Sequence, residues 1–176
     1  YLGTSCVYPK YAKNPIKEES LLTGSLEKTN QCYAIAKIAG IKLSEALYEN
    51  QNLDIICLMP TNVYGLNDNF DKFHGHVIPA MISKFLEAKS KKANKIYLLG
   101  TGKPIREFIH AKDLAEAIFT SLNISRKKLK KNFKNKLPIF NIGTSESLNI
   151  SRLAKLIAKL VNFKGKIIFD SRFPDG

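Results

Sequence analysis

Residues 30–43 read Asn30-Gln31-Cys32-Tyr33-Ala34-Ile35-Ala36-Lys37-Ile38-Ala39-Gly40-Ile41-Lys42-Leu43. Apolar residues here and just beyond recur at a helical period, which predicts a helix from Tyr33 to about Asn50 with one buried face. The apolar positions that define this face are 35, 38, 39, 43, 46 and 47. Residues four apart lie on the same side of a helix, so the Tyr33 hydroxyl and the Lys37 ammonium can share a site. A nearby cation favours the phenolate form of a tyrosine, which makes the pair a candidate general acid and base. A surface pair on an amphipathic helix is the alternative.

Segments rich in hydroxyl groups and proline flank this helix. Before it comes Tyr1-Leu2-Gly3-Thr4-Ser5-Cys6-Val7-Tyr8-Pro9, and after it comes Leu58-Met59-Pro60-Thr61-Asn62-Val63-Tyr64-Gly65. We expect residues 1–5 to end a strand and the apolar run 53–58 to form a parallel strand covered on both faces. The polar residues 9–29 are expected to form a loop over the site.

Strands and helices alternate through the rest of the chain. Helices are expected at 77–88, 113–122 and 150–161, strands at 96–99, 139–142 and 166–169, and an extended segment at 106–110. Asn149 is a good cap for the last helix. This alternation predicts an α/β fold with a mostly parallel sheet. No glycine-rich dinucleotide-binding turn follows a strand in this sequence.

Composition bounds the class of protein. The 176 residues are 44% hydrophobic, as in one ordinary globular domain, and no apolar run approaches the ~20 residues that span a bilayer. Cys6, Cys32 and Cys57 have unrelated spacings, which gives neither a disulfide framework nor a metal-binding pattern, so we expect reduced thiols in a cytoplasm.

The net charge is +13, and part of it is concentrated in one run. Seven cations with no intervening acid lie at positions 126, 127, 128, 130, 131, 134 and 136. We interpret residues 126–136 as a solvated loop, which can also steer an anionic ligand by long-range attraction. A basic nucleic-acid-binding module without catalysis is the alternative.

The order of these motifs resembles that of the extended short-chain dehydrogenase/reductases, and the finer matches resemble the GDP-L-fucose synthase family within them. The matching segments are 8–10, 33–42, 59–62, 68–70, 76–80, 106–110 and 174–176. The resemblance implies the C-terminal part of a Rossmann-type doubly wound parallel sheet plus a smaller mixed α/β substrate-binding lobe.

The resemblance also implies a division of the chain. Residues 1–65 would form the catalytic half of the nucleotide-binding domain, and 136–148 its returning strand. Residues 66–135 would form most of the substrate-binding lobe, with 149–176 adding an incomplete remainder. The glycine-rich phosphate turn would lie upstream, so the isolated chain is expected to be inactive.

The implied activity is NADPH-dependent epimerisation and reduction of GDP-4-keto-6-deoxy-D-mannose to GDP-L-fucose. NADP(H) is the implied cofactor, a GDP-sugar the substrate, and a homodimer the implied state of the full-length protein, with no membrane or nucleic-acid partner. Another extended short-chain nucleotide-sugar epimerase or dehydratase is the alternative enzyme.

The resemblance assigns catalytic roles by position. Tyr33 would be the acid for reduction, and Lys37 would tune it and touch the nicotinamide ribose. Thr4 matches the catalytic hydroxyl, with Ser5 as the adjacent alternative. Cys6 and His76 match the epimerisation base and acid.

Structural roles are the alternatives for this last pair: a core thiol for Cys6 and a helix cap for His76. His74 competes weakly with His76, and His110 is expected to be structural.

Binding residues follow from the same matches. The segment behind the nicotinamide would be Pro60, Thr61, Asn62 and Val63, and the implied cofactor contacts are these four with Thr4, Ser5, Tyr33, Lys37 and His76.

For the substrate, Lys84 and Arg106 match phosphate contacts, and Asp175 matches a sugar or ribose contact. Leu99 departs from the family, in which several members have a tryptophan covering the substrate, so the contact at this position stays open.

Overall fold

The computed structural model describes residues 1–72 and 74–175, so Gly176, the last residue of the 174–176 segment, lies outside the described residues. The chain divides into two compact units. Unit 1 comprises Tyr1–Val63 and Ile109–Thr144, and unit 2 comprises Tyr64–Phe108 and the chain from Ser145 onward. Strands β2 (Asn62–Tyr64) and β4 (Ile105–His110) carry the chain from one unit to the other.

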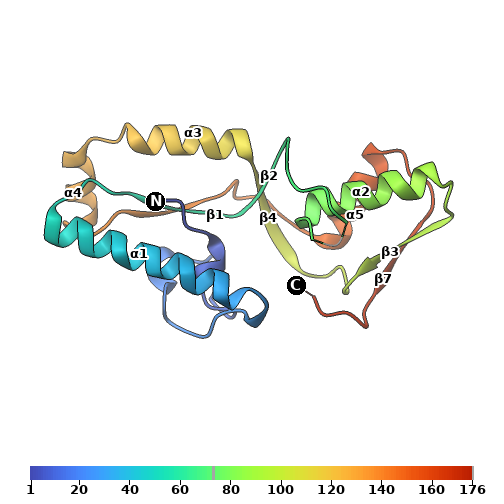
Figure 1. Ribbon diagram of the computed structural model, residues 1–176, viewed down its shortest axis with the longest axis horizontal. Coiled ribbons are helices and arrows are strands. Elements are labelled where there is room, and N and C mark those ends of the chain that lie inside the picture. Colours follow the sequence, from blue (N-terminus) through green and yellow to red (C-terminus); the bar gives the residue numbers. More distant parts are fainter. Residues whose placement is uncertain (73, 176) are drawn as a thin grey trace. The chain divides into compact units, whose positions relative to one another are not determined.

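Unit 1 has the predicted α/β architecture. Strand β1 (Cys57–Pro60) pairs in parallel with β5 (Ile139–Ile142), with Cys57 opposite Ile139 and Met59 opposite Asn141. Helices α1 (Gln31–Gln51) and α3 (Ala111–Leu122) lie on opposite sides of this pair (Figure 1). Helices on both faces of parallel strands are the layers of a Rossmann-type sheet, which confirms the predicted fold class.

The start of the chain is less regular than predicted. Leu2 makes only an isolated parallel bridge to Leu58, and the Gly3 N–H donates to the Leu58 carbonyl at 2.8 Å. Residues Ser5–Val7 form the short 3-10 helix η1, because Thr4 turns the chain by accepting the Cys6 N–H on its hydroxyl. The expected strand end over residues 1–5 is therefore reduced to the single bridge at Leu2, and position 5 already begins the 3-10 helix.

The following strand begins later than expected. Residues 53–56 lie outside it, and Leu53 is exposed. Two features account for this: Asn52 ends α1 in the left-handed conformation, with φ of 55°, and Asp54 pairs with the distant Arg126 at 2.7 Å. The apolar pattern of 53–58 correctly predicted a strand here, but the strand starts at Cys57 and not at Leu53.

The loop between η1 and α1 contains two short 3-10 helices, η2 (Glu18–Ser20) and η3 (Lys28–Asn30). It packs inward through Ile16, Leu21 and Leu26, which lie against the core of unit 1. The loop is therefore a packed segment of this unit.

Helix α1 is present as predicted, but the expected buried face is wrong. Its buried residues are Ala34, Ile38, Ile41, Ser44 and Tyr48. Of the six positions that the prediction assigned to the buried face, Ile38 is buried and position 47 half-buried, while 35, 39, 43 and 46 are exposed. The helix has two apolar stripes, and only one of them packs against the core of unit 1.

The basic run is also different from the prediction. Residues Arg126–Phe133 form helix α4, which Ser125 caps by accepting the Lys128 N–H. Arg126 donates to the Asn52 carbonyl oxygen at 2.8 Å, and the Phe133 ring packs edge-on against Phe140 at 5.1 Å between centroids. Contacts at both ends therefore hold a helix where the charge pattern alone predicted a solvated loop.

These contacts also explain a domain boundary that differs from the expectation. Residues 109–135 were assigned to the lobe, and the structure places them in unit 1 with α3 and α4. The C-terminal end of α1 is the neighbour of α4 (Figure 1), which joins the basic helix to this unit.

Unit 2 is a smaller α/β layer. Strand β3 (Lys95–Leu99) pairs in parallel with β7 (Lys166–Asp170), and α2 (Val77–Ser90) packs against both β3 and α5 (Ile150–Leu160). Buried side chains of α2, β3 and α5 share one core, which includes Met81, Phe85, Ile96, Leu98, Leu153 and Ile157, and partly buried residues of β7 pack against it.

The predicted cap of α5 is confirmed: Asn149 Oδ1 accepts the Arg152 N–H at 2.8 Å. Strand β6 (Ser147–Asn149) pairs antiparallel with β4, in a sheet of order β2-β4-β6. Among the described helices, none has the length and apolar character needed to cross a membrane.

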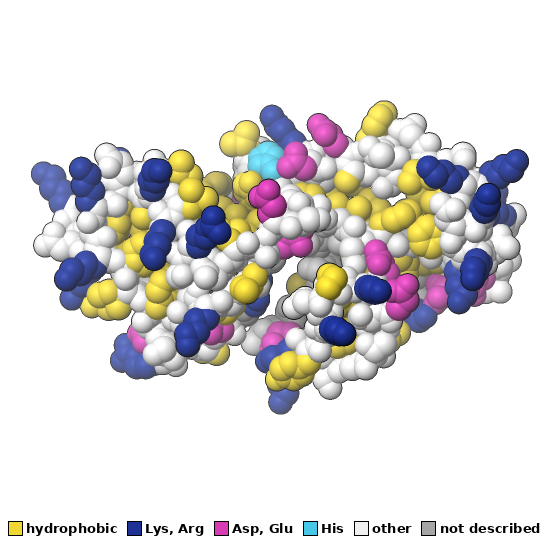
Figure 2. All heavy atoms as spheres, turned by 180° about the vertical axis from the view of Figure 1, so that it is seen from behind, with side chains coloured by type: hydrophobic (Ala, Val, Ile, Leu, Met, Phe, Trp, Pro, Cys, Tyr) yellow, Lys and Arg dark blue, Asp and Glu magenta, His cyan; other side chains and the backbone are white. Residues whose placement is uncertain are grey.

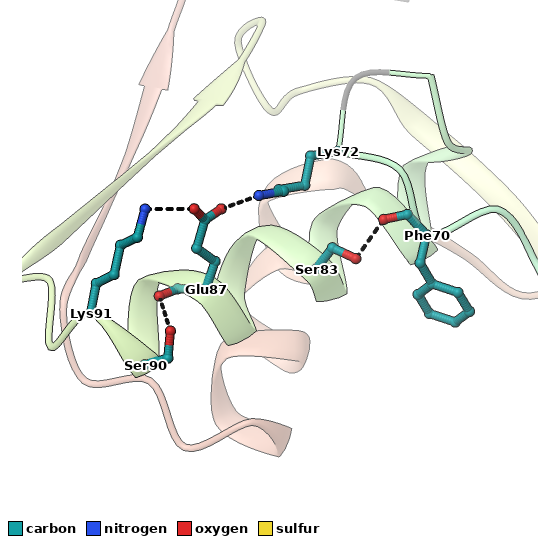
Figure 3. A network of polar contacts seen from close by, with 6 residues as sticks. All are labelled: Phe70, Lys72, Ser83, Glu87, Ser90 and Lys91. Carbon is teal, nitrogen blue, oxygen red and sulfur yellow. Dashed lines mark hydrogen bonds and ion pairs between the residues drawn. The ribbon is translucent and has the colours of Figure 1, made fainter.

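A polar network fastens the segment before α2 to the helix itself (Figure 3). Glu87 accepts from Lys72 at 2.5 Å and from Lys91 at 2.7 Å, and the Ser83 hydroxyl donates to the Phe70 carbonyl at 2.6 Å. Hydrogen bonds from the two ammonium groups lower the pKa of Glu87 to about 2, and the bond from Lys72 has the larger effect.

This carboxylate gives a pH-dependent prediction. A free glutamate has a pKa of about 4.3, so the stabilisation from Glu87 is fully present above that pH and is lost as pH falls toward 2. Glu87→Gln should lower the melting temperature by roughly 1–3 °C at pH 6, and by less at pH 3. Thermal unfolding at the two pH values measures this. Glu116→Gln, an exposed acid on α3, is the control with no effect; an equal deficit for Glu87→Gln at both pH values would contradict the assignment.

Candidate functional site

The predicted pair on α1 is formed in the structure. The Lys37 ammonium lies 5.8 Å from the centre of the Tyr33 ring and 5.6 Å from the centre of the Tyr1 ring. It donates one hydrogen bond to the Leu2 carbonyl oxygen at 3.0 Å, which leaves two of its three N–H groups for a ligand. The Tyr33 side chain is half exposed, and its hydroxyl has no hydrogen-bond partner among the described residues.

Thr4, Ser5 and Cys6 follow directly from this anchored chain start. Thr4 is buried, and its hydroxyl oxygen accepts the Cys6 N–H at 3.3 Å. An accepting hydroxyl still has its own proton to donate, and within the described chain neither the Thr4 nor the Ser5 hydroxyl donates to another group. Either can therefore offer a hydrogen bond to a carbonyl oxygen, and both assignments stay open.

The three cysteines differ in exposure. Cys6 is half-buried, Cys32 is exposed and Cys57 is fully buried. Burial raises the pKa of the Cys57 thiol, which makes this residue a poor base. Cys6 lies beside the candidate hydroxyl groups of Thr4 and Ser5 and is partly accessible to solvent. The fully buried core thiol is that of Cys57 and not that of Cys6.

The segment expected behind the nicotinamide lies at the carboxyl end of β1. Pro60 is buried, and the Thr61 N–H donates to the Ile142 carbonyl at 3.0 Å. The Thr61 hydroxyl oxygen is buried and has no hydrogen-bond partner among the described residues, while Asn62 and Val63 continue into β2. An orphaned polar atom at the end of a parallel strand fits a polar ligand such as the nicotinamide part of NADP(H).

The histidines lie at the entrance to α2 and α3. His76 occupies the position before α2 but makes no capping hydrogen bond, so the helix-cap alternative is not supported. Its side chain is 82% exposed, with Nδ1 3.6 Å from Asp68 Oδ1. His74 is also exposed and pairs with Asp71 at 3.1 Å. His110 accepts the Lys112 N–H at 3.2 Å as the cap of α3, which confirms its predicted structural role.

The predicted substrate contacts all lie in unit 2. Lys84 is half-buried on α2 and has no ion-pair partner among the described residues. Arg106 on β4 donates to the Ile105 carbonyl at 2.9 Å, and Leu99 is exposed at the end of β3.

Asp175 has a structural task that sequence reasoning missed. Its two carboxylate oxygens accept the Thr101 N–H and the Thr101 hydroxyl, both at 2.7 Å. These bonds, with the Arg106 and Lys103 charges, lower the pKa of Asp175. Gly100 has φ of 83°, and a Cβ there would collide with the Asp175 carboxylate. The Gly100-Thr101-Gly102 turn was the feature of the sequence that could have indicated this structural role of Asp175. The predicted sugar contact at Asp175 stays a prediction.

The predicted residues thus fall into two groups. Unit 1 holds Thr4, Ser5, Cys6, Tyr33, Lys37 and 60–63, and unit 2 holds His76, Lys84, Leu99, Arg106 and Asp175. Cys6 and His76 lie in different units, and their meeting at one site stays a prediction. Within the described residues, no group of three His, Cys, Asp or Glu side chains is placed to hold a metal ion.

Positive charge is not confined to one surface. Figure 2 shows Lys and Arg side chains distributed over the visible face of each unit. In the basic helix α4, the Arg126 side chain and the Lys130 ammonium contact Asn52. Two of the seven cations of the basic run are thus engaged within unit 1.

Comparison with known proteins places these features in a family. The family model described as the NAD dependent epimerase/dehydratase family matches residues 1–143. The GDP-L-fucose synthase of Escherichia coli is 44% identical over the whole chain, which covers 55% of that protein. The chain spans about half the length of the curated relatives it matches.

Solved structures give the same picture. A GDP-6-OMe-4-keto-L-xylo-heptose reductase from C. jejuni superposes with a TM-score of 0.86 at 34% identity, over 99% of this chain and 59% of that one. A GDP-mannoheptose C4 reductase from Campylobacter jejuni with NADP bound gives a TM-score of 0.79 at 33% identity, over 96% of this chain and 58% of that one.

Proposed function

The chain belongs to the NAD dependent epimerase/dehydratase family, and we propose that it is part of an NADP-dependent enzyme that epimerises and reduces GDP-4-keto-6-deoxy-D-mannose to GDP-L-fucose. The observation that carries the proposal is the placement of the Lys37 ammonium over the Tyr33 ring, with the phenol left free for a ligand. The E. coli relative, named GDP-L-fucose synthase, supports the substrate.

The cofactor fits the carboxyl end of β1. NADPH would supply the hydride when bound. Lys37 has two free N–H groups for a ribose, and the buried Thr61 hydroxyl lacks a partner that a nicotinamide could provide. The solved C. jejuni C4 reductase with NADP bound supports the choice of this cofactor.

Reduction of a ketone requires a proton at its oxygen. The Tyr33 hydroxyl would donate this proton, with the Lys37 ammonium 5.8 Å from the centre of its ring. The Thr4 hydroxyl, whose proton is uncommitted within the described chain, would hold the same oxygen by a hydrogen bond.

Epimerisation requires a base and an acid on opposite faces of the sugar. The ketone acidifies the protons of its two neighbouring carbons, so a modest base can remove one. We assign this role to the Cys6 thiolate, and the return of a proton to the other face to His76. Cys6 is partly open to solvent and the His76 ring is 82% exposed, so both are accessible for such a role.

The nucleotide part of the substrate carries a diphosphate. Arg106 offers the bidentate donor geometry that suits phosphate, and Lys84 offers a cation without an acidic partner among the described residues. Asp175, already bound to Thr101, would present the remaining acceptor capacity of its carboxylate to a sugar hydroxyl.

The exposed stripe of α1 supports a homodimer of the full-length protein. Ile35 and Leu43 are 52% and 61% exposed, and the exposed Ala39 lies between them on the same side of the helix. Small and apolar residues at helical spacing allow two helices to pack closely. A second copy of α1 packed against this stripe would bury it. The resemblance to extended short-chain enzymes implies such a homodimer.

Tyr33→Phe tests the reduction. It removes only the phenolic hydroxyl, so we expect turnover to fall by roughly 10²–10⁴-fold, since a positioned general acid contributes about that factor. NADPH oxidation by the full-length protein with the keto sugar measures it. Tyr11→Phe, on an 86% exposed tyrosine, is the matched control. Turnover of Tyr33→Phe within twofold of the unmodified protein would remove the assignment.

Cys6→Ser and His76→Asn test the epimerisation. Cys6→Ser is nearly isosteric, and His76→Asn leaves a smaller polar side chain. Both changes remove the titrating group, so deuterium uptake from D₂O next to the ketone should fall by at least roughly 10²-fold. Mass spectrometry of the sugar measures this, with Cys32→Ser as the control. If Cys6→Ser exchanges as fast as the unmodified protein, Cys6 is not the base; if fucose stereochemistry never forms with unmodified protein, the proposed function fails.

Leu43→Glu tests the dimer. A charge on the α1 stripe would be buried without a partner at the dimer interface, so we expect the full-length protein to sediment as a monomer. Leu86→Glu, on an exposed leucine of α2, is the matched control and should leave the mass unchanged. An unaltered dimer in Leu43→Glu would show that another surface pairs.

A further inference from the structure

The helix η1 carries Cys6 but is weakly held by its own hydrogen bonds. The Cys6 N–H reaches the Thr4 hydroxyl at 3.3 Å, and the Val7 and Tyr8 N–H groups reach the Thr4 and Ser5 carbonyls, also at 3.3 Å each. All three lie beyond the usual N–H···O range of 2.7–3.2 Å. A single turn of this kind does not fix a side chain by itself, so its position depends on what anchors its two ends.

The ends of η1 are anchored by much shorter contacts. On the N-terminal side, the Gly3 N–H donates to the Leu58 carbonyl at 2.8 Å. On the C-terminal side, Tyr8 is 5% exposed, and its hydroxyl donates to Asn141 Oδ1 at 2.5 Å. Asn141 lies 133 positions away on β5, so this bond ties the turn directly to the sheet.

Asn141 is held in one orientation by two further bonds. Its Nδ2 donates to the Ile16 carbonyl at 3.0 Å, which leaves Oδ1 to face Tyr8. Its backbone N–H donates to Glu18 Oε1 at 2.8 Å. The turn η1, the strand β5 and the loop before α1 therefore meet at this one residue.

Tyr8 is suited to permanent donation and unsuited to proton exchange. Burial, and next the Glu18 carboxylate, raise the pKa of the Tyr8 phenol above its usual value. The phenol therefore stays protonated at neutral pH. Its ring packs in the core beside Val7, Ile38 and Ile41, so it acts through the turn that it closes.

We propose that Tyr8 and Asn141 are positioning residues that hold η1, and with it the Cys6 thiol and the Thr4 hydroxyl, in a single arrangement against β5 and the 9–29 loop. The consequence for epimerisation rests on the proposed function; the positioning of the thiol does not. Neither residue is assigned to cofactor, substrate or proton transfer.

The three cysteines allow a direct test within the protein. In Tyr8→Phe the ring is kept and the anchor is lost, so η1 should open more often. Because one such hydrogen bond contributes about 1 kcal/mol, the alkylation rate of Cys6 by iodoacetamide should rise by roughly 3- to 10-fold. Peptide mass spectrometry should find the exposed Cys32 unchanged and the buried Cys57 still protected.

Tyr48→Phe is the matched control. Tyr48 is also buried, at 8% exposure, and its hydroxyl has no hydrogen-bond partner among the described residues. Tyr48→Phe removes a phenolic oxygen from unit 1, as Tyr8→Phe does, and should leave the alkylation rate of Cys6 unchanged. An unchanged Cys6 rate in Tyr8→Phe, or parallel labelling of Cys57 that marks general loosening, would overturn the proposal.

A double variant shows whether Tyr8 acts through Asn141. If it does, Asn141→Leu should raise the Cys6 rate as Tyr8→Phe does, and the pair together should add little. Additive effects would overturn the coupling.

In the full-length enzyme, Tyr8→Phe should slow deuterium uptake several-fold with KM unchanged. Absence of fucose synthesis by unmodified protein would end the proposed function alone, because the alkylation result is independent of activity.

Discussion

The hydrogen bond from the Lys37 ammonium to the Leu2 carbonyl joins the helix that carries Tyr33 to the segment that carries the hydroxyl groups. The same segment is held on its other side by Leu58 of β1, through Gly3. On the helix side the Tyr1 ring lies against Gly40, where a Cβ would displace the Tyr1 hydroxyl from its present position. One ammonium thus fixes the distance between α1 and Thr4 and still has two N–H groups for a ligand.

The candidate functional groups of unit 1 lie near one end of the parallel strands. Pro60 and Thr61 lie at the carboxyl end of β1, and Asn141 is near the same end of β5. Carboxyl ends of parallel strands form the usual ligand-binding edge of an open α/β sheet. At this edge, Asn141 has a structural role, because it joins η1, β5 and the loop before α1. Tyr8 and Asn141 stabilise the turn that carries Thr4 and Cys6.

Local patterns predicted most elements, and tertiary contacts decided the details that they missed. The alternation of apolar runs located α2, α3, α5, β3, β5 and β7, and Asn149 marked a true helix cap. The buried face of α1 was wrong because this helix has two apolar stripes, and periodicity cannot tell which one meets the core. Helix α4 was missed because Arg126 is held by Asn52 and Asp54, more than seventy positions away. The pair of Tyr33 and Lys37 was predictable since helical spacing alone brings these residues together; the Tyr8 and Asn141 bond was not, since no local pattern relates them.

The proposed reduction and epimerisation require residues from both units to act on one ketone. The most direct measurement is a crystal structure of the full-length protein with NADP⁺ and the GDP-sugar bound. We expect the Tyr33 and Thr4 hydroxyls at roughly 2.6–3.2 Å from the C4 oxygen, with Cys6 and His76 on opposite faces of the sugar ring. Cys6 or His76 lying out of reach of the carbons beside C4 would contradict the account.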